Sequence, residues 1–171
     1  MFLIVEGMDN SGKSTLVNQL SNDLKLLVLN NRKRPQTVSE ARCYLDLMLP
    51  MARHFPTILD RLAVISEPVY GPICRKTHLF SLSQIEFQLE VMNPMHPLVI
   101  YCRPPDSVIL NFGEREQMEG VIDHAPELLK KYDSYMAWLQ SNWLQVISYD
   151  WKSDSYEDLR NRAAAHLKGR P

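Results

Sequence analysis

The sequence has little that would tie it to a nucleic acid, a membrane or a disulfide framework. Lys and Arg number 19 and Asp and Glu number 20, giving a formal net charge of −1, whereas proteins that bind along nucleic-acid backbones usually carry a basic excess. Apolar runs such as 26–29 and 98–102 are far shorter than the ~18 residues needed to cross a bilayer. The three cysteines lack CxxC spacing, so neither a disulfide framework nor a zinc site is favoured.

The N-terminal segment is also unlike a signal peptide, because it has no basic n-region and its apolar stretch ends at Val5. We therefore expect a cytoplasmic protein with small-molecule partners rather than a nucleic acid or a membrane. The chain has 171 residues, of which 45% are hydrophobic, which is enough for a sizeable core but short for two domains. Since there is no internal repeat or linker, we expect one domain over residues 1–171.

Apolar runs and helical periodicities alternate along the chain. Apolar runs indicate strands at 2–5, 26–29, 57–59, 98–102 and 144–149. Apolar spacing predicts helices at 13–26, 38–55, from Ser81 onwards, at 123–139 and after Ser153, with a kink or break at Pro50. This alternation predicts a three-layer α/β fold, with a five-stranded parallel sheet covered by helices on both faces. Ligands of such sheets bind at the carboxyl ends of the strands.

Residues 7–15, GMDNSGKST, match the phosphate-loop pattern G-x-x-x-x-G-K-[ST]. The glycines let the backbone wrap an anion, and the following helix start presents partial positive charge to it. Lys13 adds a mobile charge for the β- and γ-phosphates, and Ser14 offers a hydroxyl to Mg²⁺. The motif predicts a site for ATP and Mg²⁺, with phosphate contacts from Gly7, Asn10, Ser11, Gly12, Lys13, Ser14 and Thr15.

Two carboxylates, Glu6 and Asp9, lie beside this anion site, where a negative charge needs a partner such as a sugar hydroxyl, an arginine or a metal-bound water. A loop hydrogen bond is the alternative for Asp9. The run 2–16, FLIVEGMDNSGKSTL, closely resembles the start of thymidylate kinases, which read Glu-Gly-x-Asp-x-x-Gly-Lys-Ser/Thr-Thr. The resemblance implies a P-loop NTPase fold with Glu6 and Asp9 on the acceptor side, Asp9 contacting the 3′-hydroxyl of a deoxyribose.

Asp60 and Arg61 follow the third expected strand, and SEPVYGP, residues 66–72, comes next. By spacing alone this Asp-Arg pair could be an exposed ion pair. The combination resembles phage proteins of the thymidylate-kinase type. That resemblance implies that Arg61 binds the acceptor 5′-phosphate, that Asp60 reaches Mg²⁺ directly or through water, and that Glu67 and Tyr70 line the acceptor pocket.

Two further arginines are candidates for charge stabilisation during phosphoryl transfer. Arg103 follows the fourth strand, where deoxynucleoside kinases show a similar Ile-Tyr-Leu-Arg; a surface arginine is the alternative. Kinases of this type close a short lid over the phosphates, which we place at about 111–121. Here the lid holds only Arg115 among glutamates, which departs from thymidylate kinases with several basic lid residues. A solvated salt bridge is the alternative for Arg115.

Base recognition has no distinctive local motif. Arg42 and Gln84 are candidates for the acceptor base, although a surface role explains each as well. Trp151 follows the fifth strand, where the adenine of ATP usually packs in this superfamily, or it is a packing residue. The helix around 45–51 could supply a homodimer face, and core packing explains its apolar residues equally well.

Together these features predict a nucleoside monophosphate kinase that transfers the ATP γ-phosphate to a deoxynucleoside monophosphate such as dTMP. Its charge-handling residues would be Lys13, Asp60, Arg103 and Arg115. The first alternative is a deoxynucleoside kinase, in which Glu6 or Asp60 would be the general base for a 5′-hydroxyl. The second is a non-enzymatic nucleotide-binding protein. For a phage protein, the expected location is the host cytoplasm.

Overall fold

The computed structural model describes residues 1–30, 35–113 and 119–169. Within them the strands form one parallel sheet: β1 (Leu3–Glu6), β2 (Leu27–Asn30), β3 (Thr57–Asp60), β4 (Leu98–Cys102) and β5 (Gln145–Tyr149). The strand order is β2-β3-β1-β4-β5, which places β1 at the centre. All five strands lie close to their expected positions, so the predicted α/β class and parallel sheet are confirmed.

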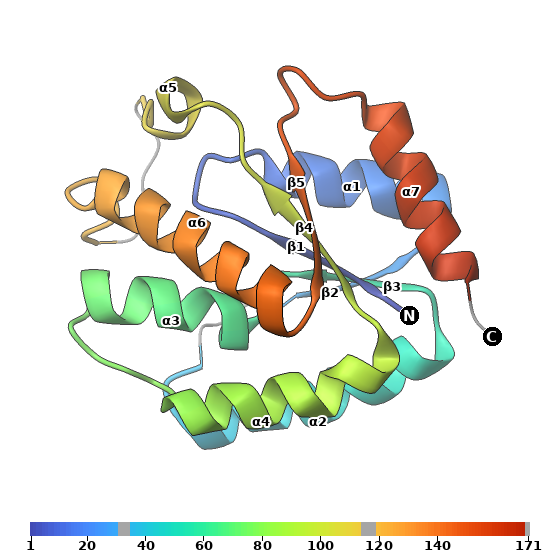
Figure 1. Ribbon diagram of the computed structural model, residues 1–171, viewed down its shortest axis with the longest axis horizontal. Coiled ribbons are helices and arrows are strands. Elements are labelled where there is room, and N and C mark those ends of the chain that lie inside the picture. Colours follow the sequence, from blue (N-terminus) through green and yellow to red (C-terminus); the bar gives the residue numbers. More distant parts are fainter. Residues whose placement is uncertain (31–34, 114–118, 170–171) are drawn as a thin grey trace.

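Helices cover both faces of the sheet and complete the three layers (Figure 1). One face packs against α1 (Lys13–Leu24) and α7 (Tyr156–Lys168). The other packs against α2 (Val38–His54), α3 (Ala63–Cys74), α4 (Leu82–Met92) and α6 (Ala125–Asn142). Two short elements, the 3₁₀ helix η1 (Asn93–Met95) and α5 (Asp106–Ile109), flank β4.

The sequence of β1 explains its central place. Its four residues are all fully buried, with Leu3 and Val5 in the core beneath α1 and α7 and Ile4 in the core on the other side. Successive strand residues point to opposite faces, so a strand covered on both sides needs a continuous apolar run. This burial fixes the carboxyl end of β1, from which the phosphate loop leaves.

Two of the described helices, α2 and α3, contain prolines, and α2 has the expected range without a break at Pro50. α2 continues past Pro50 to His54, and the Phe55 amide still donates to the Met51 carbonyl at 2.9 Å; the exposed proline removes one hydrogen bond without ending the helix. The segment 66–71, for which the sequence predicts no helix, lies inside α3, which contains Pro68 and Pro72. Seven of its twelve residues are buried, so tertiary packing outweighs low helix propensity there.

None of the described helices is long and apolar enough to cross a membrane. On α2, Leu45, Met48 and Leu49 are in the core, whereas Leu47 is 64% exposed and Met51 is 39% exposed. The expected homodimer face on this helix therefore stays a prediction that depends on the two exposed side chains.

Candidate active site

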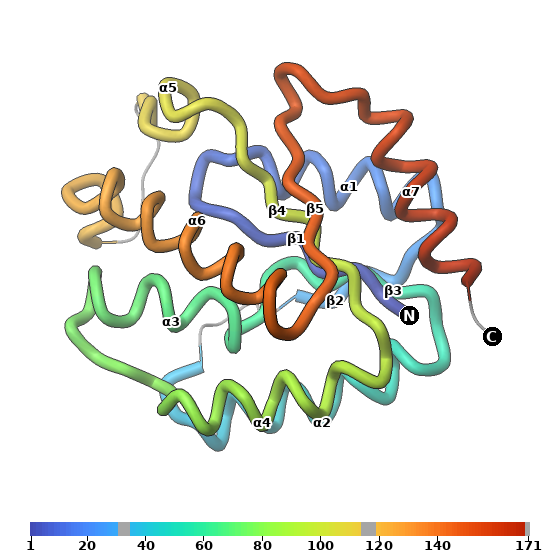
Figure 2. The backbone as a smooth tube through the Cα atoms, in the orientation of Figure 1, coloured from blue at the N-terminus to red at the C-terminus, as the bar shows by residue number. Residues whose placement is uncertain are grey.

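The phosphate loop joins β1 to α1 at the carboxyl edge of the sheet, at the same end as α5 (Figure 2). Gly7 and Gly12 have φ angles of 145° and 90°. A Cβ at Gly7 would lie 2.6 Å from the Cys102 carbonyl oxygen, so no larger residue fits between β1 and β4 without displacement. α1 begins at Lys13 and directs its free N-terminal amides toward the loop.

A cavity of about 410 Å³ lies over this loop. It brings together residues from the ends of β1, β2 and β3 and from the start of α1. They are Asp9, Asn10, Gly12, Lys13, Ser14, Thr15, Asn30, Asp60 and Arg61. Eight of these nine residues are sequence candidates. Asn30 was missed, although its place at the end of β2 is where strand topology locates ligand-binding groups.

The Lys13 ammonium is buried and donates to the Met8 carbonyl oxygen at 2.6 Å. Burial, and next the positive charge of Arg61, lower the pKa of Lys13 to about 8. This lysine is therefore held inside the loop as a stronger acid than usual. A bound phosphate would raise its pKa again, because a nearby negative charge stabilises the ammonium form. Ser11, also buried, has a hydroxyl oxygen with no hydrogen-bond partner among the described residues.

Asp9 is held from two sides. Arg61 forms an ion pair with its carboxylate, and the Tyr70 hydroxyl donates to the same carboxylate at 3.2 Å while accepting from the Asp9 amide at 3.1 Å. The Arg61 guanidinium also lies 5.4 Å from the centre of the Tyr70 ring. The structure therefore brings these three residues, predicted for the acceptor side, into one cluster.

Glu6 lies beneath this cluster and is fully buried. Its carboxylate accepts from the Leu62 amide at 2.6 Å, the Gly7 amide at 3.4 Å and the Tyr132 hydroxyl at 3.3 Å. Burial raises the pKa of Glu6, against the opposing effect of Arg61. These bonds link β1, α3 and α6. Tyr132 has no sequence signal of function, because it falls on the apolar face of α6.

Arg103 is occupied by carboxylates of this chain. Its guanidinium donates to the two oxygens of Asp133 at 2.8 and 3.0 Å and pairs with Asp106 at 2.7 Å. To reach a phosphate it would have to leave these partners. Asp133, on α6, was not a sequence candidate. Arg115 and lid residues 114–118 lie outside the described residues.

The remaining acceptor candidates lie around two other cavities. Glu67 is buried, pairs with Arg75 at 2.6 Å and lines a cavity of about 280 Å³ beside α3, α4 and α6. Arg42 and Gln84 line a cavity of about 330 Å³ between α2 and α4. The Gln84 side chain also accepts from the Ser81 amide at 2.8 Å in a capping box that begins α4.

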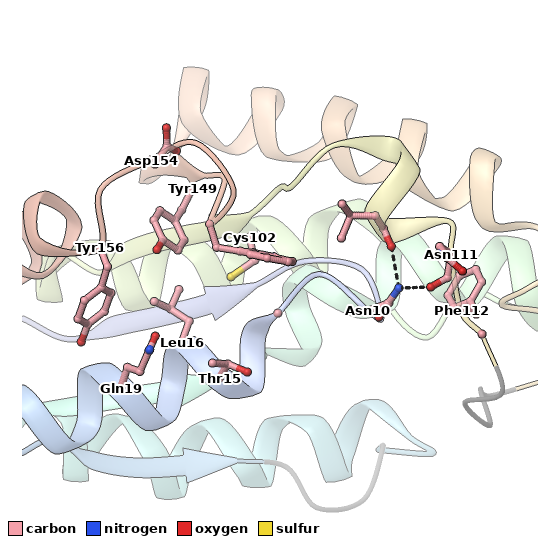
Figure 3. A pocket seen from close by; sticks show the side chains of 14 residues that line it. Asn10, Thr15, Leu16, Gln19, Cys102, Asn111, Phe112, Tyr149, Asp154 and Tyr156 are labelled. Carbon is pink, nitrogen blue, oxygen red and sulfur yellow. Dashed lines mark hydrogen bonds between the residues drawn. The ribbon is translucent and has the colours of Figure 1, made fainter.

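The largest described cavity, about 790 Å³, lies on the other side of the phosphate loop (Figure 3). Trp151 forms one wall and packs on the loop itself: a Cβ at Gly12 would lie 2.9 Å from its indole nitrogen. Asn111 and Phe112 line the cavity too. Sequence reasoning placed these two in the expected lid and gave them no role of their own.

Comparison with known proteins supports the fold. No family model matches this sequence, and no curated protein sequence matches it. Among solved structures, the YorR protein from Bacillus subtilis, in complex with phosphorylated GDP, has a TM-score of 0.72 at 22% identity, over 95% of this chain and 92% of that chain. Deoxyadenosine kinase from M. mycoides with bound dATP has a TM-score of 0.62 at 14% identity, over 95% and 98% of the two chains.

Thymidylate kinase from Ehrlichia chaffeensis has a TM-score of 0.55 at 14% identity, over 98% of this chain and 96% of that chain. These identities are low, so the likeness concerns the fold alone. The phosphate loop, the central β1 and the helices on both faces agree with it. The chain has the fold of the P-loop nucleotide and nucleoside kinases.

Proposed function

We propose that the protein is an ATP-dependent phosphotransferase that phosphorylates a deoxynucleoside monophosphate such as dTMP. The observation that carries this proposal is the single cavity shared by Lys13, Ser14, Asp60 and Arg61. It places a cation from the end of β3 opposite the phosphate loop. Phosphoryl transfer is mostly positioning and charge neutralisation, and this arrangement offers positive charge to both a donor and an acceptor.

The side chains around the cavity fit Mg²⁺. Ser14 contributes a hydroxyl and Asp60 a carboxylate, and Mg²⁺ typically takes one or two protein oxygens together with phosphates and water. Among the described residues, no group of three or more His, Cys, Asp or Glu could hold a metal ion. When bound, Mg²⁺ would neutralise charge on the transferred phosphoryl group.

On the acceptor side, Arg61 would exchange its ion pair with Asp9 for the acceptor 5′-phosphate. A guanidinium can hold a phosphate through two parallel hydrogen bonds. Asp9, released from Arg61 but still bonded to Tyr70, would accept a hydrogen bond from the deoxyribose 3′-hydroxyl. The names of two similar structures, deoxyadenosine kinase and thymidylate kinase, support a deoxynucleoside-type acceptor.

The acceptor base would reach toward the cavity between α2 and α4, with Arg42 and Gln84 at its edge. Gln88 lines the same cavity, is only 7% exposed, and has a side-chain oxygen with no partner among the described residues. A buried unpaired acceptor is costly, so this oxygen supports a polar ligand here. The donor base would occupy the larger cavity beside Trp151.

A second candidate, a deoxynucleoside kinase, is favoured by one observation. Asp9 already offsets the charge of Arg61, and a site whose cation is neutralised suits an uncharged 5′-hydroxyl better than a phosphate dianion. Asp60, beside Arg61 in the same cavity, would then be the general base; Glu6 is fully buried with its carboxylate engaged.

The test is ATP consumption by the wild-type protein with Mg²⁺, measured against a panel of deoxynucleosides and their monophosphates. We expect turnover with a monophosphate, dTMP first. If only nucleosides are turned over, the protein is a deoxynucleoside kinase and the monophosphate-kinase proposal is wrong. Nucleotide binding without turnover of any acceptor would contradict both.

A further inference from the structure

The Asn10 side chain connects the phosphate loop to α5. Its Nδ2 group donates to the carbonyl oxygens of Val108 at 2.8 Å and Asn111 at 2.7 Å (Figure 3), and to that of Ile109 at 3.3 Å. These residues are about one hundred positions away in the chain. A phosphate-loop side chain therefore contacts main-chain acceptors of a different segment. Its amide N–H groups bond to these carbonyl oxygens rather than pointing to a bound phosphate.

This contact supplies hydrogen-bond donors to carbonyl groups at the end of α5. The last carbonyls of a helix have no intrahelical partner, and α5 has only four residues, Asp106–Ile109. One amide group supplies two N–H donors to three carbonyls, so the bonds are shared. Asn10 has a φ of 67°, a conformation that asparagine tolerates better than most residues. A carboxylate in its place would repel the same carbonyls.

Asn10 also stands between the two cavities of the proposed site, since it lines both the one over the phosphate loop and the larger one. The segment that it holds, 108–113, contributes Val108, Asn111, Phe112 and Gly113 to the larger cavity. Phe112 is 7% exposed and Ile109 is fully buried. Core packing therefore anchors this segment on one side, and Asn10 anchors it on the other.

The opposite wall of the larger cavity depends on the same loop. Trp151 packs where Gly12 has no side chain. The phosphate loop thus contacts both walls of this cavity. The Asn10 amide bonds to the segment 108–113, and Trp151 packs against Gly12, where a Cβ would be in the way.

We propose that Asn10 is a positioning residue for the donor nucleotide: it fixes the wall formed by 108–113 relative to the phosphate loop, so that the nucleoside part of the donor fits while the loop holds its phosphates. The proposal rests on the proposed function. It predicts that loss of the Asn10 amide weakens binding of the nucleoside part of ATP and leaves binding of the phosphate chain nearly unchanged.

The test compares Asn10→Gly with the wild type. Glycine accepts the φ of 67° and removes only the side chain. Dissociation constants are measured for ATP and for inorganic tripolyphosphate, both with Mg²⁺. We expect the ATP constant to rise about tenfold and the tripolyphosphate constant to change less than about twofold, as for the loss of well-placed hydrogen bonds.

Hydrogen exchange tests the contact directly. The Leu110 and Asn111 amides donate within this segment, to Asp106 and Val108. They should exchange about tenfold faster in Asn10→Gly and in Asn10→Asp, while amides of β1 keep their wild-type rates. Asn18→Asp, an exposed position on α1, is the charge-matched control and should leave these rates unchanged. If Asn10→Gly does not fold, the exchange rates of the Leu110 and Asn111 amides in Asn10→Asp test the Asn10 contact instead.

Equal weakening of ATP and tripolyphosphate, or unchanged exchange at Leu110 and Asn111, would overturn the proposal for Asn10. If the wild-type protein binds no nucleotide, the proposed function fails and the donor role of Asn10 fails with it. The exchange rates report on the Asn10 contact in either case, so the two failures are distinguishable.

Discussion

Arg61 and Asp9 form an ion pair between the end of β3 and the phosphate loop. Both side chains are about one quarter exposed, at 27% and 28%, and both line the cavity that holds Lys13. The pair therefore lies where an acceptor would enter, and it separates the two candidate reactions. A phosphate would compete with Asp9 for Arg61, whereas a 5′-hydroxyl would leave the pair intact.

Arg61→Ala should raise the KM for the acceptor monophosphate at least tenfold and change the KM for ATP less than about threefold, because the lost cation would contact only the acceptor phosphate. Steady-state kinetics with each substrate varied in turn gives both constants. Arg53→Ala, at an exposed site in the last turn of α2, is the matched control. Equal increases in both KM values would remove Arg61 from acceptor binding.

Asp9→Asn should lower kcat/KM by roughly 10- to 100-fold with a deoxynucleoside monophosphate, since a charge-assisted hydrogen bond contributes ~1.5–3 kcal/mol. A 2′,3′-dideoxy acceptor lacks the partner hydroxyl, so it should be poor with the wild type and lose little more with the variant. Measuring both acceptors with both proteins gives a double-mutant cycle. Losses that simply multiply would show that Asp9 does not contact that hydroxyl.

Tyr70→Phe helps to interpret this cycle. It removes the hydroxyl that donates to the Asp9 carboxylate but leaves the carboxylate itself. We expect a smaller loss than for Asp9→Asn, of a few-fold in kcat/KM, because only the orientation of Asp9 is loosened. A loss as large as that of Asp9→Asn would assign the catalytic effect to the network rather than to the carboxylate.

The parts of this site that could be predicted are those with a local cause. The run before Glu6 is apolar because β1 is buried on both faces, and the spacing of Gly7, Gly12 and Lys13 follows from wrapping an anion. Asp60 and Arg61 were found because topology gathers the residues that follow parallel strands at one edge. None of these inferences needed knowledge of a distant contact.

The parts that were missed depend on contacts between distant segments. α3 forms in spite of two prolines because α6 and the sheet bury it, and propensity says nothing of that burial. The bond of Tyr132 to Glu6 spans 126 positions, and Tyr132 looks like any apolar helix residue. The pairing of Arg103 with Asp133 could not be predicted from the sequence for the same reason. Charged residues are common on helix surfaces, and nothing in the local sequence of α6 indicates that Asp133 lies beside Arg103.

The pH dependence of ATP binding should reveal the lowered pKa of Lys13. Burial and the charge of Arg61 lower the pKa of Lys13 to about 8 in the free protein, whereas a bound phosphate would raise this pKa again. Well below pH 8 the lysine is charged in both states and contributes no slope. Above pH 8, binding takes up one proton, so the ATP dissociation constant should rise up to tenfold per pH unit until the bound lysine also titrates.

Calorimetric titrations at pH 7 and pH 8.5, each in two buffers of different ionisation enthalpy, measure this proton uptake. For a free-protein pKa of about 8, we expect an uptake of about 0.1 proton at pH 7 and about 0.75 proton at pH 8.5. Lys13→Met should abolish the difference between the two pH values. Equal uptake by the variant would assign the proton to another group.

Trp151 should report occupation of the larger cavity. It is 42% exposed and lines that cavity, so a stacked base would change its surroundings. We expect ATP to change the tryptophan fluorescence of the wild type and of Trp143→Phe, but not that of Trp151→Phe. We also expect Trp151→Phe to bind ATP within about threefold of the wild type, because an aromatic face remains. A full signal from Trp151→Phe would exclude contact between this residue and the donor.

The proposed reaction is measured by transfer of the labelled γ-phosphate of ATP to an acceptor, followed by separation of the products. We expect the wild type to label a deoxynucleoside monophosphate to give the diphosphate, and Lys13→Ala, folded by its circular dichroism, to do so at least ~10²-fold more slowly. Label released only as inorganic phosphate, or equal transfer by Lys13→Ala, would contradict this expectation.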